Sequence, residues 1–175
     1  MAMLTTISRA ELAHAAEYPL AVVGHQIIGG QVNSRDVRDS SALVSFLDDV
    51  ASAAASATAW LELRALDYTP RALPIEFPPS HFQFAVDAAL HVAAAAVLVL
   101  DRDGISHQWL SQGASEHHDA VLVADPWNPV TRFPGESAIT LAELRRAAAQ
   151  WAFGEVFPPP AIRWRDASEE EIGWI

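Results

Sequence analysis

Hydrophobic residues recur at helical spacing in two segments of the chain. In residues 40–54 they form one continuous face, which predicts an amphipathic helix capped by one of the two serines at its start. Residues 141–153 follow Thr140 and Glu143, whose spacing is that of a capping box. Gly154 comes directly after the last apolar position and is a typical residue at the end of a helix. We therefore predict two amphipathic helices, one in each half of the chain.

Other segments alternate between apolar and polar residues, or are apolar throughout, and these patterns predict strands. Within residues 58–66, Leu61 and Leu63 face one way while Trp60 and Glu62 face the other, which indicates a strand with one partly polar face. The segments predicted as strands are residues 20–23 with a continuation at 27–28, 58–66, 81–86, 89–100, 105–110, 120–124 and 161–165. Within residues 89–100, the alanines at 93–96 also suit a helix.

The segments between these elements are polar or rich in glycine and proline, and we predict that they are connections. Residues 31–39 and 111–119 are polar, and residues 68–79 contain four prolines. The sequence Asp101-Arg102-Asp103-Gly104 predicts a hairpin turn, because glycine supplies the positive φ that such a turn requires.

Together these elements predict an α+β fold: a single domain with a largely antiparallel sheet and helices packed on one face. Near the N-terminus, Ser8 and Glu11 have the spacing of a capping box, which predicts a short helix over residues 8–18. We predict that residues 1–36 form an N-terminal extension packed on the domain formed by residues 37–175.

Length and composition fit a protein of this kind. The 175 residues are enough for one ordinary domain with its own core, and 51% of them are hydrophobic. Cysteine is absent, which excludes disulfides, thiolate metal sites and cysteine nucleophiles. No apolar run reaches the roughly 18 residues of a membrane span, and the first residues lack the pattern of a signal peptide. We therefore expect a cytoplasmic protein with no membrane partner.

The chain is strongly acidic. It has 22 acidic residues against 11 basic ones, all of them arginine, for a net charge of −11. This balance argues against nucleic acid or an anionic membrane as a partner, because both require a basic patch. It is compatible with a basic protein partner, although acidity for solubility alone is a common alternative.

One dense group of possible metal ligands occurs, at Glu116-His117-His118-Asp119. Together with His107 or Asp125 this group has the ligand types for zinc, but its spacing fits no helical His-x-x-x-His or HExxH pattern. We therefore predict no metal, no cofactor and no catalytic residues, and expect a solvated or partner-facing loop. A small metal-dependent enzyme that uses the His117-His118 loop is the alternative.

Two further patterns point to catalysis or metal binding only weakly. Asp101-x-Asp103-Gly104 resembles the start of a calcium loop, but Gln112 stands where the bidentate glutamate is needed, so a hairpin turn is the better interpretation. Ser111 precedes Gly113, but no G-x-S-x-G motif surrounds a serine and no base is placed beside Ser111.

Trp127 lies in a loop between two prolines, outside any periodic apolar face. Rigid exposed aromatic residues are typical anchors of protein interfaces, and the prolines reduce the entropy that the loop loses on binding. The alternative is a ring that folds back as a lid over the core. The tryptophans on patterned elements are predicted to be core residues: Trp60, Trp109, Trp151 and Trp164.

The order of the elements in the second half resembles a known family. Trp109-Leu110-Ser111-Gln112-Gly113 matches an aromatic-x-Ser-x-Gly element, and a loop reaching Phe133-Pro134-Gly135-Glu136-Ser137 leads to the capped helix and a strand at Ile162-Arg163-Trp164. This order is similar to the end of the first immunity-protein family (Imm-type one) of bacterial polymorphic toxin systems. Residues 41–54 and 58–66 are similar to its opening helix and strand, so the resemblance covers roughly residues 40 to 166.

The resemblance implies an immunity protein that binds its cognate secreted toxin domain in a 1:1 complex and inhibits it by occluding the active site. The lysine-free, Ala- and Arg-rich composition indicates a high-GC genome, which favours the antitoxin of an NAD glycohydrolase like the tuberculosis necrotizing toxin. Nuclease and deaminase toxins are alternatives, and so is a structural or assembly role in a secretion apparatus. The predicted toxin contacts are Ser111, Gln112, Glu116, His117, His118, Asp119, Asp125, Trp127, Asn128 and Arg132.

Overall fold

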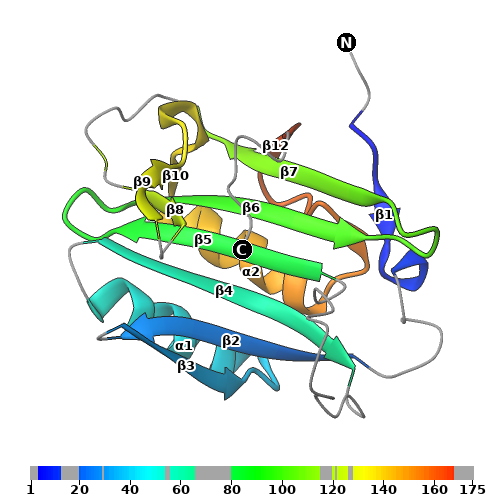
Figure 1. The fold of residues 1–175 in the computed structure, drawn as a ribbon, viewed down its shortest axis with the longest axis horizontal. Coiled ribbons are helices and arrows are strands. Elements are labelled where there is room, and N and C mark those ends of the chain that lie inside the picture. The colour runs from blue at the N-terminus through cyan, green and yellow to red at the C-terminus, as the bar shows by residue number, and fades with distance from the viewer. Residues whose placement is uncertain are drawn as a thin grey trace.

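The computed structural model describes residues 4–12, 20–28, 30–53, 56–65, 80–114, 120, 122–125 and 128–167. Within these residues a large antiparallel sheet carries two α-helices on one of its faces, so the predicted α+β class is confirmed (Figure 1). The elements are β1 (Ile7–Ser8), η1 (Arg9–Glu11), β2 (Leu20–Ile28), β3 (Gln31–Asp36), α1 (Ser40–Ala53), β4 (Ser56–Ala65), β5 (Ser80–Asp87), β6 (Val92–Leu100), β7 (Ser106–Gln112), β8 (Val123–Asp125), β9 (Asn128–Arg132), η2 (Gly135–Ser137), β10 (Ile139–Thr140), α2 (Leu141–Phe153), β11 (Val156–Phe157) and β12 (Arg163–Asp166).

Eight strands of the described chain form the principal sheet, in the order β12-β7-β6-β5-β4-β2-β3, with β10 pairing at one end of β6. All of these pairings are antiparallel. The run Ala93–Val97 in β6 is buried at every position, because this strand is covered on both faces and such strands are apolar throughout.

The main hydrophobic core lies between the sheet and the two helices. Phe82 and Phe84 of β5 project toward the helices, where Phe84 packs edge-on against Phe46 of α1 and Phe82 packs against Trp151 of α2. The helix face of the sheet is therefore filled by aromatic residues. Of the tryptophans predicted to lie in the core, Trp109, Trp151 and Trp164 are buried and Trp60 is half-buried.

The predicted limits of α2 are confirmed. Thr140 Oγ1 accepts a hydrogen bond from the backbone N–H of Glu143, and Glu143 Oε2 accepts one from the N–H of Thr140 at 2.8 Å. At the other end a Cβ on Gly154 would lie 2.3 Å from the carbonyl oxygen of Gln150. Glycine is required there by the close approach of the backbone.

The cap of α1 differs from the prediction. The helix already begins at Ser40, so neither Ser40 nor Ser41 precedes it. Instead the carboxylate of Asp39 accepts a hydrogen bond from the N–H of Ala42 at 2.9 Å, which is the usual contact of an N-cap side chain.

The N-terminal region is part of the sheet, which corrects two predictions. Residues 31–36 were expected in a loop but form the edge strand β3, whose six residues are all exposed. A fully exposed edge strand is polar, so its sequence resembles that of a loop. Because β2 and β3 belong to the principal sheet, residues 20–36 are built into the domain and are not an extension packed on it.

The short N-terminal helix is also smaller than predicted. Ser8 and Glu11 do form the capping box, but only the 3-10 turn Arg9–Glu11 follows it. Leu12 is extended, fully buried and bridged to Asp101. The helix therefore ends at Glu11, and residues 13–19 lie outside the described residues.

The apolar segment 120–124 does not join the principal sheet as predicted. Val123–Asp125 forms β8, which pairs with β9 in a separate two-stranded hairpin in front of the sheet (Figure 1). Leu122 and Ala124 are buried against Ala85 and Ala94 of the sheet face opposite the helices. We call this the hairpin face. The segment is apolar because it packs on that face, which gives the same pattern as a strand inside a sheet.

Candidate functional site

A group of polar side chains crosses the hairpin face near the β3 edge of the sheet. Side chains that pair in register on neighbouring antiparallel strands lie side by side on one face. The register pairs His25 of β2 with Ser34 of β3 and with Trp60 of β4. On β4, Glu62 and Arg64 follow Trp60 on the same face. We call these five residues the His25 cluster.

His25 contacts a polar group on each side of its ring. Its Nδ1 lies 2.8 Å from Ser34 Oγ, at hydrogen-bond distance. Its Nε2 lies 3.1 Å from Glu62 Oε2, which is an ion-pair distance, but the N–H of Nε2 is not aligned with this oxygen as a hydrogen bond requires. An ionised carboxylate only accepts, so we assign the proton of the neutral ring to Nε2. Ser34 Oγ then donates its hydrogen to Nδ1.

Two neighbours hold this arrangement in place. Arg64 Nε donates to Glu62 Oε1 at 2.9 Å, and the ring of Trp60 stacks on that of His25 with centroids 5.1 Å apart. Burial alone would raise the pKa of Glu62, but its contacts with His25 and Arg64 outweigh burial and lower the pKa to about 2. Glu62 is therefore ionised at neutral pH.

His81 of β5 stands opposite Glu62 in the register. The pKa of His81 is lowered to about 4, mainly by desolvation; the charge of Glu62 opposes this shift and His25 adds to it. At neutral pH His81 is uncharged. It adds a neutral imidazole beside the cluster.

The His25 cluster combines an exposed hydroxyl with a buried base. Ser34 is exposed, whereas His25 is only 5% exposed. A hydroxyl, an imidazole and a carboxylate in this order can activate the hydroxyl as a nucleophile. The same contacts also satisfy polar groups that would otherwise be buried without partners.

The predicted toxin contacts do not gather at the His25 cluster. Gln112 is exposed at the end of β7, and Arg132 is exposed on β9. Asp125 is half-buried at the end of β8 and pairs in register with Asn128 of β9. The remaining predicted contacts, apart from Ser111, lie outside the described residues: Glu116, His117, His118, Asp119 and Trp127.

Ser111 is a core residue, and its assignment as a toxin contact is corrected. It is 0% exposed in β7. Its Oγ donates to the carbonyl oxygen of Ser137 at 2.6 Å and accepts the N–H of Ala95 at 3.0 Å. The aromatic-x-Ser-x-Gly element therefore joins β6, β7 and the segment before α2, and its serine has no surface to offer a partner.

Three of the predicted toxin contacts, Asp125, Asn128 and Arg132, lie on the β8–β9 hairpin, which is hydrogen-bonded to the sheet. Thr58 Oγ1 donates to the carbonyl oxygen of Val123 at 2.8 Å, and Gln83 Nε2 donates to that of Ala124. In contrast, Val130 of β9 is 84% exposed. The hairpin is thus fixed to the sheet on one side and presents an apolar residue to solvent on the other.

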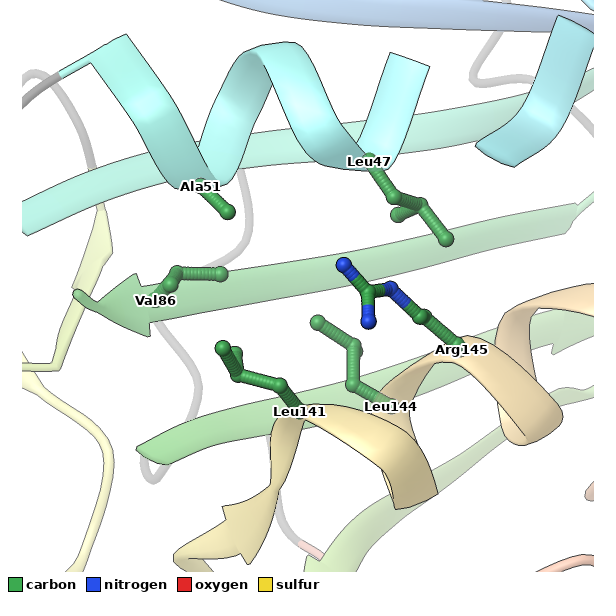
Figure 2. A pocket seen from close by; sticks show the side chains of 6 residues that line it. All are labelled: Leu47, Ala51, Val86, Leu141, Leu144 and Arg145. Atoms are coloured by element: carbon green, nitrogen blue, oxygen red, sulfur yellow. The ribbon is translucent and has the colours of Figure 1, made fainter. Parts of the chain in front are cut away.

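Among the described residues, possible metal ligands do not gather in groups of three, and the pocket between the two helices is small. The described residues contain no group of three or more His, Asp or Glu residues that could hold a metal ion. A shallow pocket between α1 and α2 is lined by Leu47, Leu144 and Arg145, and its volume of about 10 Å³ is that of a single water molecule (Figure 2). This pocket is too small for a ligand.

The His25 cluster was missed at the sequence level. The alternation of Trp60, Glu62 and Arg64 with leucines did predict a strand with a polar face. The pairing of that strand with β2, and of β2 with a strand at residues 31–36, could not be read from the pattern. His25 and Ser34 therefore had no visible connection to Glu62.

No family model, curated protein or solved structure matches this chain. In the part of the chain that the structure describes, the helices are too short or too polar to span a bilayer.

Proposed function

We propose that this chain is a cytoplasmic immunity protein that binds its cognate toxin in a 1:1 complex and inhibits it by occluding the active site. Inhibition of this kind needs a rigid, complementary surface and requires neither a cofactor nor a metal. The observation that carries the proposal is the β8–β9 hairpin, whose base is locked to the sheet while Val130 stands 84% exposed.

A hairpin of this kind suits inhibition by occlusion. Its backbone carbonyls at Val123 and Ala124 accept hydrogen bonds from the sheet, and Leu122 is buried beneath it. A preorganised segment loses little conformational entropy when it binds, so more of its contact energy appears as affinity. An apolar residue such as Val130 that is exposed in the free protein gains most when a partner covers it.

The elements that resemble the immunity-protein family form the support of this hairpin. The N–H of Gly113 donates to the carbonyl oxygen of Glu136 at 2.8 Å, next to the Ser111–Ser137 bond. Phe133, which directly follows β9, is buried, and its N–H donates to the carbonyl oxygen of Leu122. The motif residues thus have structural roles that fit their place in the resemblance.

Charge favours a basic partner. The chain carries a net charge of −11, and acidic surfaces speed encounter with basic partners and select among them. Toxins that act on anionic substrates need basic clefts. Within the proposal an NAD glycohydrolase toxin is the first choice, and nuclease and deaminase toxins are the alternatives.

The metal-dependent enzyme remains a rival because its ligands, His117 and His118, lie outside the described residues. Metal analysis of the purified chain, combined with His117→Ala, separates the two. A stoichiometric metal and an activity lost in His117→Ala favour the enzyme. Toxin inhibition that survives both metal removal and His117→Ala favours the immunity protein.

The experiment that tests the proposal is co-expression with the product of the neighbouring gene. We expect that product to be toxic alone, harmless together with this chain, and recovered with it in a 1:1 complex. Val130→Arg should weaken the complex at least tenfold, about 1.4 kcal/mol, because it removes an exposed apolar contact and places a cation against a basic cleft.

Val44→Arg is the matched control, since Val44 is 49% exposed on α1, on the opposite side of the sheet. It should leave affinity and protection unchanged. A neighbouring product that is harmless alone contradicts the proposed function. Equal affinities of Val130→Arg and Val44→Arg contradict only the assignment of the hairpin.

A further inference from the structure

The His25 cluster has a property that toxin binding by the hairpin does not use. A serine hydroxyl at the surface donates to an almost fully buried histidine, and a partly buried carboxylate stands on the far side of the same ring. We propose that Ser34 is a nucleophile for acyl transfer from carboxylic esters, with His25 as its general base and Glu62 as the residue that positions the base.

The distances fit these roles. Ser34 Oγ and His25 Nδ1 are 2.8 Å apart, within reach for proton transfer. Glu62 lies 3.1 Å from Nε2, which fixes the ring tautomer that leaves Nδ1 free to accept the proton. Arg64 holds the other oxygen of the carboxylate, and Trp60 covers one face of the ring. The base is therefore held in one orientation.

The backbone at Ser34 adds a hydrogen-bond donor where an ester can approach. Hydrogen-bonded and non-hydrogen-bonded pairs alternate along an antiparallel pair of strands. The N–H of Val37 donates to the carbonyl oxygen of Val22 at 2.9 Å, so the pair of Arg35 with Gly24 is hydrogen-bonded and the pair of Ser34 with His25 is not. The N–H of Ser34 thus points away from β2, toward the outer edge of β3.

The reaction follows from this geometry. Ser34 Oγ attacks the carbonyl carbon of the ester while its proton moves to His25 Nδ1, and the Ser34 N–H donates to the oxyanion that forms. Glu62 stabilises the resulting imidazolium. The alcohol leaves with the proton from His25, and the acyl group stays on Ser34. A water molecule then gives a proton to His25 while its oxygen bonds to the acyl carbon. The bond between that carbon and Ser34 Oγ breaks, His25 returns the proton to Oγ, and the acid is released.

The test is covalent labelling of the purified full chain with a fluorophosphonate probe, followed by intact-mass and peptide analysis. We expect one adduct, on Ser34, together with slow hydrolysis of p-nitrophenyl acetate. Ser34→Ala should abolish the adduct. Because it also removes the partner of the buried His25 Nδ1, urea unfolding of the variant checks that it is folded under the labelling conditions. Ser41→Ala is the matched control and should label like the wild type. Ser41 is an exposed serine outside the His25 cluster.

Glu62 acts through His25, so its variants need a separate readout. Glu62→Gln should slow labelling at least tenfold, and Glu62→Asp should recover part of the rate, both measured under conditions in which urea unfolding shows each variant to be folded. Labelling that is absent in the wild type, or that persists unchanged in Ser34→Ala, overturns the proposal. So does labelling that tracks only the unfolding midpoint across the Glu62 variants. None of these outcomes bears on toxin binding, which Ser34→Ala should leave unchanged.

Discussion

Two serines of this chain show how the environment decides what a hydroxyl does. Ser111 is enclosed between Ala95 and Ser137 and uses both its donor and its acceptor capacity on the backbone. Ser34 is exposed, and its hydroxyl is hydrogen-bonded to the imidazole of His25. Ser111 was noticed in the sequence because the residues around it resemble a known motif, whereas Ser34 lies in a short polar segment that resembles a loop.

The role of Ser111 leads to a prediction about stability. Ser111→Ala removes the partner of a buried N–H at Ala95 and of a buried carbonyl at Ser137, and each buried group left without a partner costs about 1 to 3 kcal/mol. We expect the free energy of unfolding in urea to fall by about 2 kcal/mol or more. Ser106→Ala is the control, at an exposed serine of the same strand whose hydroxyl accepts one long hydrogen bond, 3.4 Å, from Gln108 Nε2. It should lower the free energy of unfolding by less than about 1 kcal/mol. Equal effects of the two substitutions contradict the role given to Ser111.

At the level of elements, the helices and strands with the clearest periodic pattern of apolar residues were the ones predicted correctly. The capping box at Thr140, the apolar face of α1 and the alternation in β4 each determine a local structure through neighbouring residues alone. Pairing between strands depends on contacts that are distant in the chain. The edge strand β3 and the hairpin strand β8 were therefore misassigned, although their exposure and burial agree with their composition.

The candidate sites differ in the same way. Asp125, Asn128 and Arg132 were selected as predicted contacts because polar residues and prolines interrupt an apolar pattern there, although the structure places these three residues in the strands β8 and β9 and not in a loop. The His25 cluster was not, because its members come from three strands and meet only through the register. A pattern can show that a strand has a polar face, but the register decides which polar side chains become neighbours.

The anchoring of the hairpin makes a prediction at the level of this element. Thr58→Val keeps the shape of the side chain but removes the hydrogen bond to the carbonyl oxygen of Val123. We expect a loss of about 1 kcal/mol that appears mainly as faster hydrogen exchange in β8 and β9. The matched control is Thr131→Val, a substitution on β9 itself that leaves this anchor in place. If exchange in the hairpin is the same in Thr58→Val and wild type, the hairpin is not held by this bond.

At the scale of the whole molecule, the fold lowers the pKa of several groups, so that they are less protonated than in the unfolded chain, and the largest changes are at His81 and Glu62. The pKa of His81 falls from its ordinary value of 6.5 to about 4, through burial, and that of Glu62 falls from 4.5 to about 2, through His25 and Arg64 against the effect of burial. In both cases the unfolded chain binds protons first as the pH falls. Acidification must therefore destabilise the folded state.

The two groups act in different pH ranges, which gives a testable profile. The contribution of His81 should be full above pH 6.5 and disappear as the pH falls to about 4, and that of Glu62 should disappear between about pH 4.5 and 2. Each is of the order of 2 kcal/mol, since one pKa unit corresponds to about 1.4 kcal/mol and solvent screening reduces the effect.

Urea unfolding from pH 3 to 8 measures this profile through its slope against pH. His81→Gln should flatten the slope between pH 6.5 and 4, and Glu62→Gln should flatten it below pH 4.5. The slope is the readout, because either substitution can also shift the overall stability. Two variants with the wild-type slope would show that these residues do not carry the pH dependence.

The most direct measurement of the central claim is titration of the purified neighbouring toxin, in an assay of its own reaction, with increasing amounts of this chain. An inhibitor that works by occlusion should abolish the activity at one equivalent, and Ser34→Ala should do so at the same equivalence point, because binding needs no bond to be made or broken. Full toxin activity in the presence of excess wild-type chain, or inhibition that depends on time and on Ser34, would contradict the account.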